Sequence, residues 1–155
     1  TVLVDVVPVV VRRHEVILTV GFPHNGKPAA GQGHGRGKGL VDLLLDAEGL
    51  EQGLFILVRL DGGDGSVIWA VDLPGYEPTR NPQRRRDSFY AMHGPILAGG
   101  RLIVAGSDGA LRAFDPADGR LVGSAPLANG ATTRPVVAGG VLYVVNTRGE
   151  LLAFR

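Results

Sequence analysis

The feature that most constrains this chain is an internal repeat of 40 residues near its C-terminus. Residues 95–115 align with residues 135–155 at ten of 21 positions, including a Gly-Gly pair and an Ala-Phe pair in each copy. A period near 40 residues is typical of the four-stranded blades of β-propellers, in which each unit buries its apolar faces against its neighbours. The repeat therefore predicts successive copies of one stacked sheet unit.

Within one copy, short apolar runs alternate with turn signals, as in an all-β array. Residues 97–104 read as two strands joined by Gly99-Gly100, because a two-residue hairpin turn needs two positive φ angles. Residues 107–109 and 115–119 read as further turns, and 110–115 and 120–127 as the third and fourth strands. The fold class is therefore expected to be all-β, a partial β-propeller with PQQ-like or WD40-like four-stranded blades.

A third copy of the blade pattern is partly visible upstream, where residues 60–69 align with residues 114–123. This offset of 54 residues exceeds the period by 14, and the excess falls in residues 74–93, which carry three prolines and no strand pattern. We interpret this stretch as a surface loop inserted between two blades. The aligned aspartates occupy turn positions where a carboxylate bonds its own backbone, so they are interpreted as turn residues and not as catalytic pairs: Asp61, Asp64, Asp115 and Asp118.

The pattern Leu-Asp-x-x-Asp-Gly-x-x-x-Trp at 60–69 resembles the blade signature of pyrroloquinoline-quinone-type propellers. Residues 73–104 and 134–155 are similar to the last blades of the BamB family, the periplasmic propeller lipoproteins of the outer-membrane β-barrel assembly machinery. The resemblance covers about residues 58–155. It implies an eight-bladed, non-enzymatic scaffold on the periplasmic side of the outer membrane, which binds the periplasmic domains of the barrel-inserting subunit.

The chain departs from that family pattern in ways that predict a fragment. It has no cysteine to accept a lipid anchor. It holds about two and a half blades, begins at Thr1, and its last blade stops at the third strand, whose neighbour is expected to be an N-terminal strand. Because each blade relies on its neighbours for a core, we expect the isolated chain to be marginally stable or prone to aggregate.

The chain is predicted to have two parts. Residues 58–155 form the propeller domain, and residues 1–57, which do not show the repeat, have no assigned fold. Residues 2–11 and 15–22 are predicted strands because they are rich in β-branched side chains. Residues 39–52 are a predicted short helix. The glycine-rich stretch 31–39 lacks the spacing of a phosphate-binding loop and is interpreted as a low-complexity linker. One hypothesis is that residues 1–57 are misframed, which translating the coding DNA in all frames would test.

Composition and motif spacing exclude several function classes. The net charge of +1 does not favour nucleic acid as a partner. No apolar run is long enough for a transmembrane helix. The serines lack the setting of a catalytic nucleophile, and the four histidines lack metal-ligand spacing, namely His14, His24, His34 and His93. We therefore predict no catalytic residue, no cofactor and no metal.

The residues most suited to contact a partner protein are basic and aromatic side chains in and beside the inserted loop. Arginine and aromatic residues are favoured at interfaces. The candidates are Tyr76, Arg84, Arg85, Arg86 and Tyr90, with a solvated basic loop as the plainer interpretation. Trp69 is predicted to pack between adjacent blades, although in quinone enzymes such a ring also stacks on the cofactor.

Two other functions remain open from the sequence. The chain is alternatively a fragment of a quinone-dependent, dehydrogenase-like propeller enzyme, because that class shares the blade signature, or a non-functional remnant. Reconstitution with quinone and calcium, followed by a dye-reduction assay, distinguishes an enzyme from a scaffold.

Overall fold

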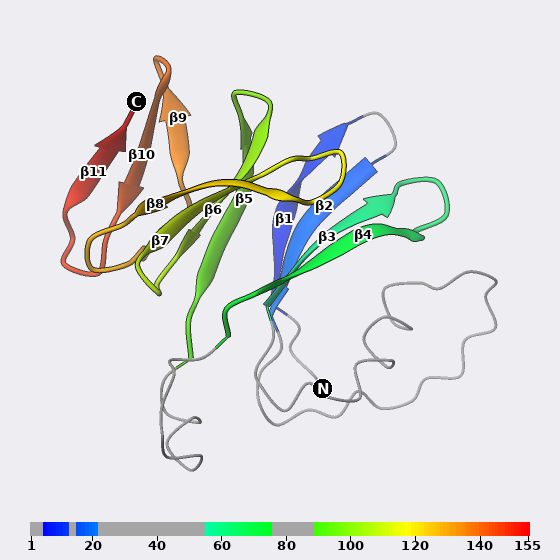
Figure 1. The fold of residues 1–155 in the computed structure, drawn as a ribbon, viewed down its shortest axis with the longest axis horizontal. Coiled ribbons are helices and arrows are strands. Elements are labelled where there is room, and N and C mark those ends of the chain that lie inside the picture. Colours follow the sequence, from blue (N-terminus) through cyan, green and yellow to red (C-terminus); the bar gives the residue numbers. More distant parts are fainter. Residues whose placement is uncertain (1–4, 13–14, 22–54, 76–88) are drawn as a thin grey trace, which may run out of the picture.

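The computed structural model describes residues 5–12, 15–21, 55–75 and 89–155, and every regular element in these ranges is a β-strand. The strands form three antiparallel sheets that stand side by side (Figure 1). The first sheet contains β1 (Asp5–Arg12), β2 (Glu15–Gly21), β3 (Phe55–Asp61) and β4 (Val67–Leu73). The second contains β5 (Met92–Ala98), β6 (Arg101–Gly106), β7 (Ala110–Phe114) and β8 (Leu121–Pro126). The third contains β9 (Val136–Ala138), β10 (Val141–Val145) and β11 (Leu151–Phe154).

In each sheet the strands pair in chain order, so each is an up-and-down meander of the kind that forms a propeller blade. The predicted all-β class and the partial propeller with PQQ-like blades are confirmed. The hairpins between β5 and β6 and between β9 and β10 use the predicted Gly-Gly turns. Gly99 and Gly100 have φ angles of +56° and +74°, and Gly139 and Gly140 have +58° and +75°. Two consecutive positive φ angles favour glycine and match the twist of the flanking strands.

The first sheet takes two of its strands from the N-terminal region. β1 overlaps the predicted strand at 2–11 and ends one residue beyond it, and β2 falls within the predicted strand at 15–22, so both predicted strands are present. β2 pairs with β3 from Glu15 opposite Asp61 to Gly21 opposite Phe55, so the sheet joins segments far apart in the chain. β3 runs across residue 57, the predicted boundary between the unassigned segment 1–57 and the propeller domain 58–155, and that boundary stays a prediction. The helix predicted at 39–52 and the linker at 31–39 lie outside the described residues.

The second sheet is apolar on both faces because a sheet lies against each of them. On β6, Leu102 and Val104 belong to a core cluster shared with the first sheet, while the alternating Ile103 and Ala105 contact a cluster shared with the third. The buried members of the first cluster are Ile17, Leu57, Leu73, Met92, Leu102, Val104 and Phe114. Those of the second are Ala105, Leu111, Leu127, Ala131 and Val144.

No helix in the described ranges has the length and apolar character needed to cross a membrane.

Candidate functional site

The turns that close the outer hairpins are built by aspartates in the same way in the first two sheets. Asp61 Oδ1 accepts a hydrogen bond from Gly63 N at 2.7 Å, and Asp64 Oδ1 accepts one from Ser66 N at 2.8 Å. In the second sheet, Asp115 Oδ1 accepts from Ala117 N at 2.8 Å, and Asp118 Oδ1 accepts from Arg120 N at 2.9 Å. The prediction that these four carboxylates are turn residues is confirmed. The bond from Ser66 lowers the pKa of Asp64.

At the junction between the first and second sheets, side chains of the first sheet donate hydrogen bonds to the aspartate turn of the second sheet. Trp69 Nε1 on β4 donates to the carbonyl oxygen of Pro116 at 3.2 Å. Arg59 Nη1 on β3 donates to the same oxygen at 2.8 Å and to the Ala117 carbonyl at 3.1 Å. The indole also lies on Gly119, where a Cβ atom would come within 2.6 Å of Trp69 Cε3. Trp69 therefore packs between blades, as predicted.

The junction between the second and third sheets is formed by the β8–β9 connection, whose backbone groups bond to both sheets. Ala131 N donates to Gly106 O at 2.9 Å, and Thr147 N donates to Gly130 O at 3.1 Å. Gly130 has φ +67° and lies so close to the β6–β7 turn that an added Cβ would stand 2.2 Å from Ser107 O. One short connection thus ties the second sheet to the third.

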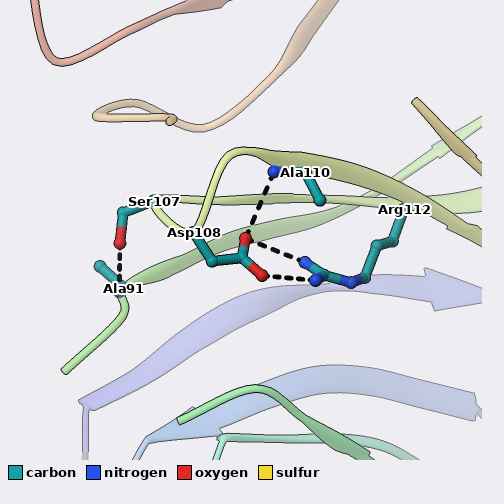
Figure 2. Close-up of polar contacts among 5 residues, drawn as sticks. All are labelled: Ala91, Ser107, Asp108, Ala110 and Arg112. Atoms are coloured by element: carbon teal, nitrogen blue, oxygen red, sulfur yellow. Dashed lines mark hydrogen bonds and ion pairs between the residues drawn. The ribbon is translucent and has the colours of Figure 1, made fainter. Parts of the chain in front are cut away.

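The β6–β7 turn carries a paired charge with little exposure to solvent (Figure 2). Asp108 Oδ1 accepts from Arg112 Nη1 at 3.0 Å, and Asp108 Oδ2 pairs with Arg112 Nη2. The side chains of Arg112 and Asp108 are 16% and 8% exposed. Ala110 N adds a bond to Asp108 at 3.3 Å, and the Ser107 hydroxyl accepts from Ala91 N at 2.8 Å on the other side of the turn. Asp108 and Gly109 predict the turn from the sequence, whereas the turn pattern does not indicate the ion pair.

The corresponding turn of the third sheet is organised by a fully buried amide. Asn146 Oδ1 accepts from the backbone N–H groups of Arg148 and Glu150, both at 3.0 Å. Its Nδ2 donates to Ala128 O at 3.1 Å and to Glu150 Oε2 at 2.7 Å. Because both amide protons and the oxygen are bonded, Asn146 is buried without loss of hydrogen bonding and has a structural role.

The predicted partner-contact residues are placed only in part. Tyr76, Arg84, Arg85 and Arg86 lie outside the described residues. Tyr90 is partly buried and packs against the first core cluster. Its neighbour Phe89 is 69% exposed, and it is the more accessible aromatic residue. Neighbouring side chains on an extended backbone point to opposite sides, which explains why one of the two residues is exposed and the other is partly buried. This alternation alone does not predict which of the two faces the solvent.

The base of the segment that holds these arginines is fixed. Tyr90 N donates to Gly75 O at 2.8 Å, so the chain leaves the first sheet and enters the second at one point. His93, two residues into β5, is half-buried. Desolvation lowers its pKa, and a hydrogen bond with the backbone of Ala131 opposes that shift. Within the described part of the chain no three acidic, histidine or cysteine side chains are close enough to hold a metal ion. His14, His24 and His34 lie outside it.

Three stacked antiparallel meanders, with aspartate turns within the first two and a tryptophan packed between those two, define the class of this protein as a PQQ-like β-propeller, present here in part. The family model described as outer membrane protein assembly factor BamB matches residues 54–155, and the chain belongs to that family. A search of curated proteins returned no match to the sequence.

Proposed function

We propose that this chain is a non-enzymatic, protein-binding scaffold of the outer-membrane assembly kind. The observation that supports the proposal is the family match. It covers strands β3 and β4 of the first sheet and all of the second and third sheets. Its partners would be the periplasmic domains of the barrel-inserting subunit, at the periplasmic side of the outer membrane. Stacked sheets suit this role because they hold connecting segments and sheet edges on a rigid frame.

The contact surface that we propose is the connection between the first and second sheets. Its described end offers the exposed ring of Phe89 beside Tyr90, and its base is pinned by the bond between Tyr90 N and Gly75 O. An exposed aromatic side chain on a fixed backbone is a typical interface anchor, because little conformational entropy is lost on binding. Tyr76, Arg84, Arg85 and Arg86 complete the proposed surface by sequence position.

Binding of the 155-residue chain to purified periplasmic domains of a barrel-inserting subunit, measured by calorimetry, tests this proposal. Phe89→Ala is expected to weaken binding by ~10-fold or more, as truncation of an interface anchor does. Leu121→Ala is the matched control, because Leu121 is an apolar side chain 51% exposed on β8, away from this connection. If the two substitutions change the binding affinity equally, Phe89 does not contribute to the interface.

The arginines are tested by charge reversal of Arg84, Arg85 and Arg86 together. Loss of affinity is expected to be largest at low salt, because screening weakens exposed charge pairs. The intact chain failing to bind the domains at any salt concentration would overturn the scaffold proposal. Dye reduction above background after reconstitution with quinone and calcium would replace it with the dehydrogenase alternative.

A further inference from the structure

The β8–β9 connection contains the dipeptide Asn129-Gly130. In such a dipeptide the backbone nitrogen of the glycine can attack the side-chain amide carbon of the asparagine, because glycine has no Cβ to hinder the approach. Asn129 is exposed to solvent, whereas Gly130 is buried. Both have left-handed backbones, with φ +63° and +67°, which asparagine and glycine tolerate better than other residues. This turn therefore favours the two residue types that make deamidation possible.

The folded connection holds the peptide group between Asn129 and Gly130 at both of its ends. Gly130 N donates to Leu127 O at 3.0 Å, and the hydroxyl of Thr147 donates to Asn129 O at 2.5 Å. To reach the side-chain carbon Cγ of Asn129, the Gly130 nitrogen has to turn together with its whole peptide group, because that group is planar. This rotation breaks both hydrogen bonds, so the closed connection opposes the reaction.

The connection also has little space for one product of the reaction. Isoaspartate carries an extra methylene group in the backbone and so lengthens the chain. At Gly130 even an added Cβ would stand 2.2 Å from Ser107 O, and on the next residue Ala131 N donates to Gly106 O at 2.9 Å. Because Gly130 O also accepts a hydrogen bond from Thr147 N at 3.1 Å, a lengthened backbone is expected to lose bonds to the second sheet, to the third, or to both.

We propose that Asn129 is a site of spontaneous deamidation that reacts when the β8–β9 connection opens, and that its isoaspartyl product keeps the connection from closing. A bond forms between Gly130 N and Asn129 Cγ, and the side-chain nitrogen leaves as ammonia with the Gly130 amide proton. The cyclic imide then takes up one water molecule. Hydrolysis at Cγ gives aspartate, and hydrolysis at the backbone carbonyl gives isoaspartate. This inference does not depend on the proposed partner-binding function.

Incubation of the 155-residue chain at mildly alkaline pH, followed by tandem mass spectrometry of its tryptic peptides, tests the site. Fragmentation distinguishes Asn129 from Asn25, which precedes the other Asn-Gly bond of the chain. Deamidation at Asn129 is expected to be ~10-fold or more slower in native buffer than in urea-unfolded chain, because only a fraction of native molecules is open at any time. Absence of deamidation at Asn129 in the unfolded chain, or equal rates in the two states, overturns the proposal.

Two substitutions of Thr147 test the hydrogen bond to the reacting peptide group. Thr147→Val removes the hydroxyl and is expected to raise the native rate roughly 2- to 10-fold, the effect of one net hydrogen bond on the opening equilibrium. Thr147→Ser keeps the hydroxyl and is expected to react at nearly the wild-type rate. Trp69→Phe weakens the junction between the first and second sheets and is expected to change the rate by less than about 2-fold, since that junction is separate. Acceleration by Trp69→Phe equal to that by Thr147→Val contradicts local opening.

Circular dichroism checks that these variants keep the β-fold. If Thr147→Val does not fold, the wild-type rate in urea below the unfolding midpoint replaces it, and a rate that does not rise with urea overturns the proposal. The isoaspartyl form, separated by chromatography, is expected to show faster amide hydrogen exchange in β9 and β10 than Asn129→Asp, which adds the charge without the methylene group. Equal exchange in the two forms overturns the second part of the proposal.

Discussion

The indole ring of Trp69 lies on Gly119 of the neighbouring sheet, and its Nε1 donates to the Pro116 carbonyl at 3.2 Å. One side chain therefore supplies both the apolar contact and the hydrogen bond of this junction. Trp69→Ala is expected to lower the free energy of unfolding by about 2–3 kcal/mol, below the range for a fully buried ring, because Trp69 is only partly buried. Trp69→Phe keeps much of the packing and is expected to cost ~1 kcal/mol for the lost bond. Urea unfolding checks both values, and equal costs would assign the whole effect to the hydrogen bond.

Gly119 and Gly65 separate the contact from the backbone strain. The two glycines occupy the same turn position, with φ +74° and +73°, but an added Cβ meets no atom within 4 Å at Gly65. Gly65→Ala is expected to cost roughly 1–2 kcal/mol for a left-handed alanine alone. Gly119→Ala is expected to cost about 1–3 kcal/mol more, because its Cβ would overlap the indole. In a Trp69→Ala background the difference between the two alanine substitutions should shrink in urea unfolding, to what the remaining contact with Val71 Cγ2 at 2.9 Å causes. A difference that Trp69→Ala leaves unchanged would contradict the contact with the indole.

The ion pair in the β6–β7 turn is expected to matter more than an exposed pair in the same sheet. Arg112→Met leaves the Asp108 carboxylate without its charge partner at a site where it is 8% exposed. The expected loss of stability is about 2–3 kcal/mol, below that of a fully buried pair because Arg112 keeps some solvent access. Arg120→Met removes the pair with Asp118, whose side chains are 69% and 59% exposed, and should change stability by less than ~0.5 kcal/mol. Thermal unfolding of both variants at one ionic strength makes the comparison.

Stability is expected to fall between neutral and mildly acidic pH because of His93. Desolvation holds its folded-state pKa below the ordinary value of 6.5, so the unfolded chain binds more protons once the pH drops through that value. The contribution of His93 is complete above pH 6.5, declines below it, and becomes constant beneath the lowered pKa. His93→Gln should flatten the slope of unfolding free energy against pH in this window. A slope unchanged by the substitution would show that other groups cause it.

The local features of the fold follow from residues close together in the chain. The Gly99-Gly100 turn and the aspartate turns at 61–65 and 115–119 each depend on backbone preferences within a few residues. The 40-residue spacing of the blades is visible as a direct repeat of the sequence. The position of Trp69 between blades was predictable for a related reason. A large aromatic group after an aspartate turn has few other places to bury its ring once sheets are known to stack.

Features that depend on residues distant in sequence were not predictable in this way. The pairing of β2 with β3, the choice of Arg112 as the partner of Asp108, and the exposure of Phe89 in place of Tyr90 are set by which surfaces meet. The sequence alone determined the repeating unit, because strand, turn and spacing are local properties of the backbone. Only the tertiary structure decided which copies of an apolar face are covered. Leu111 and Leu151 are the same residue in the same position of the repeat, and burial of one and exposure of the other depend on whether a sheet lies against them.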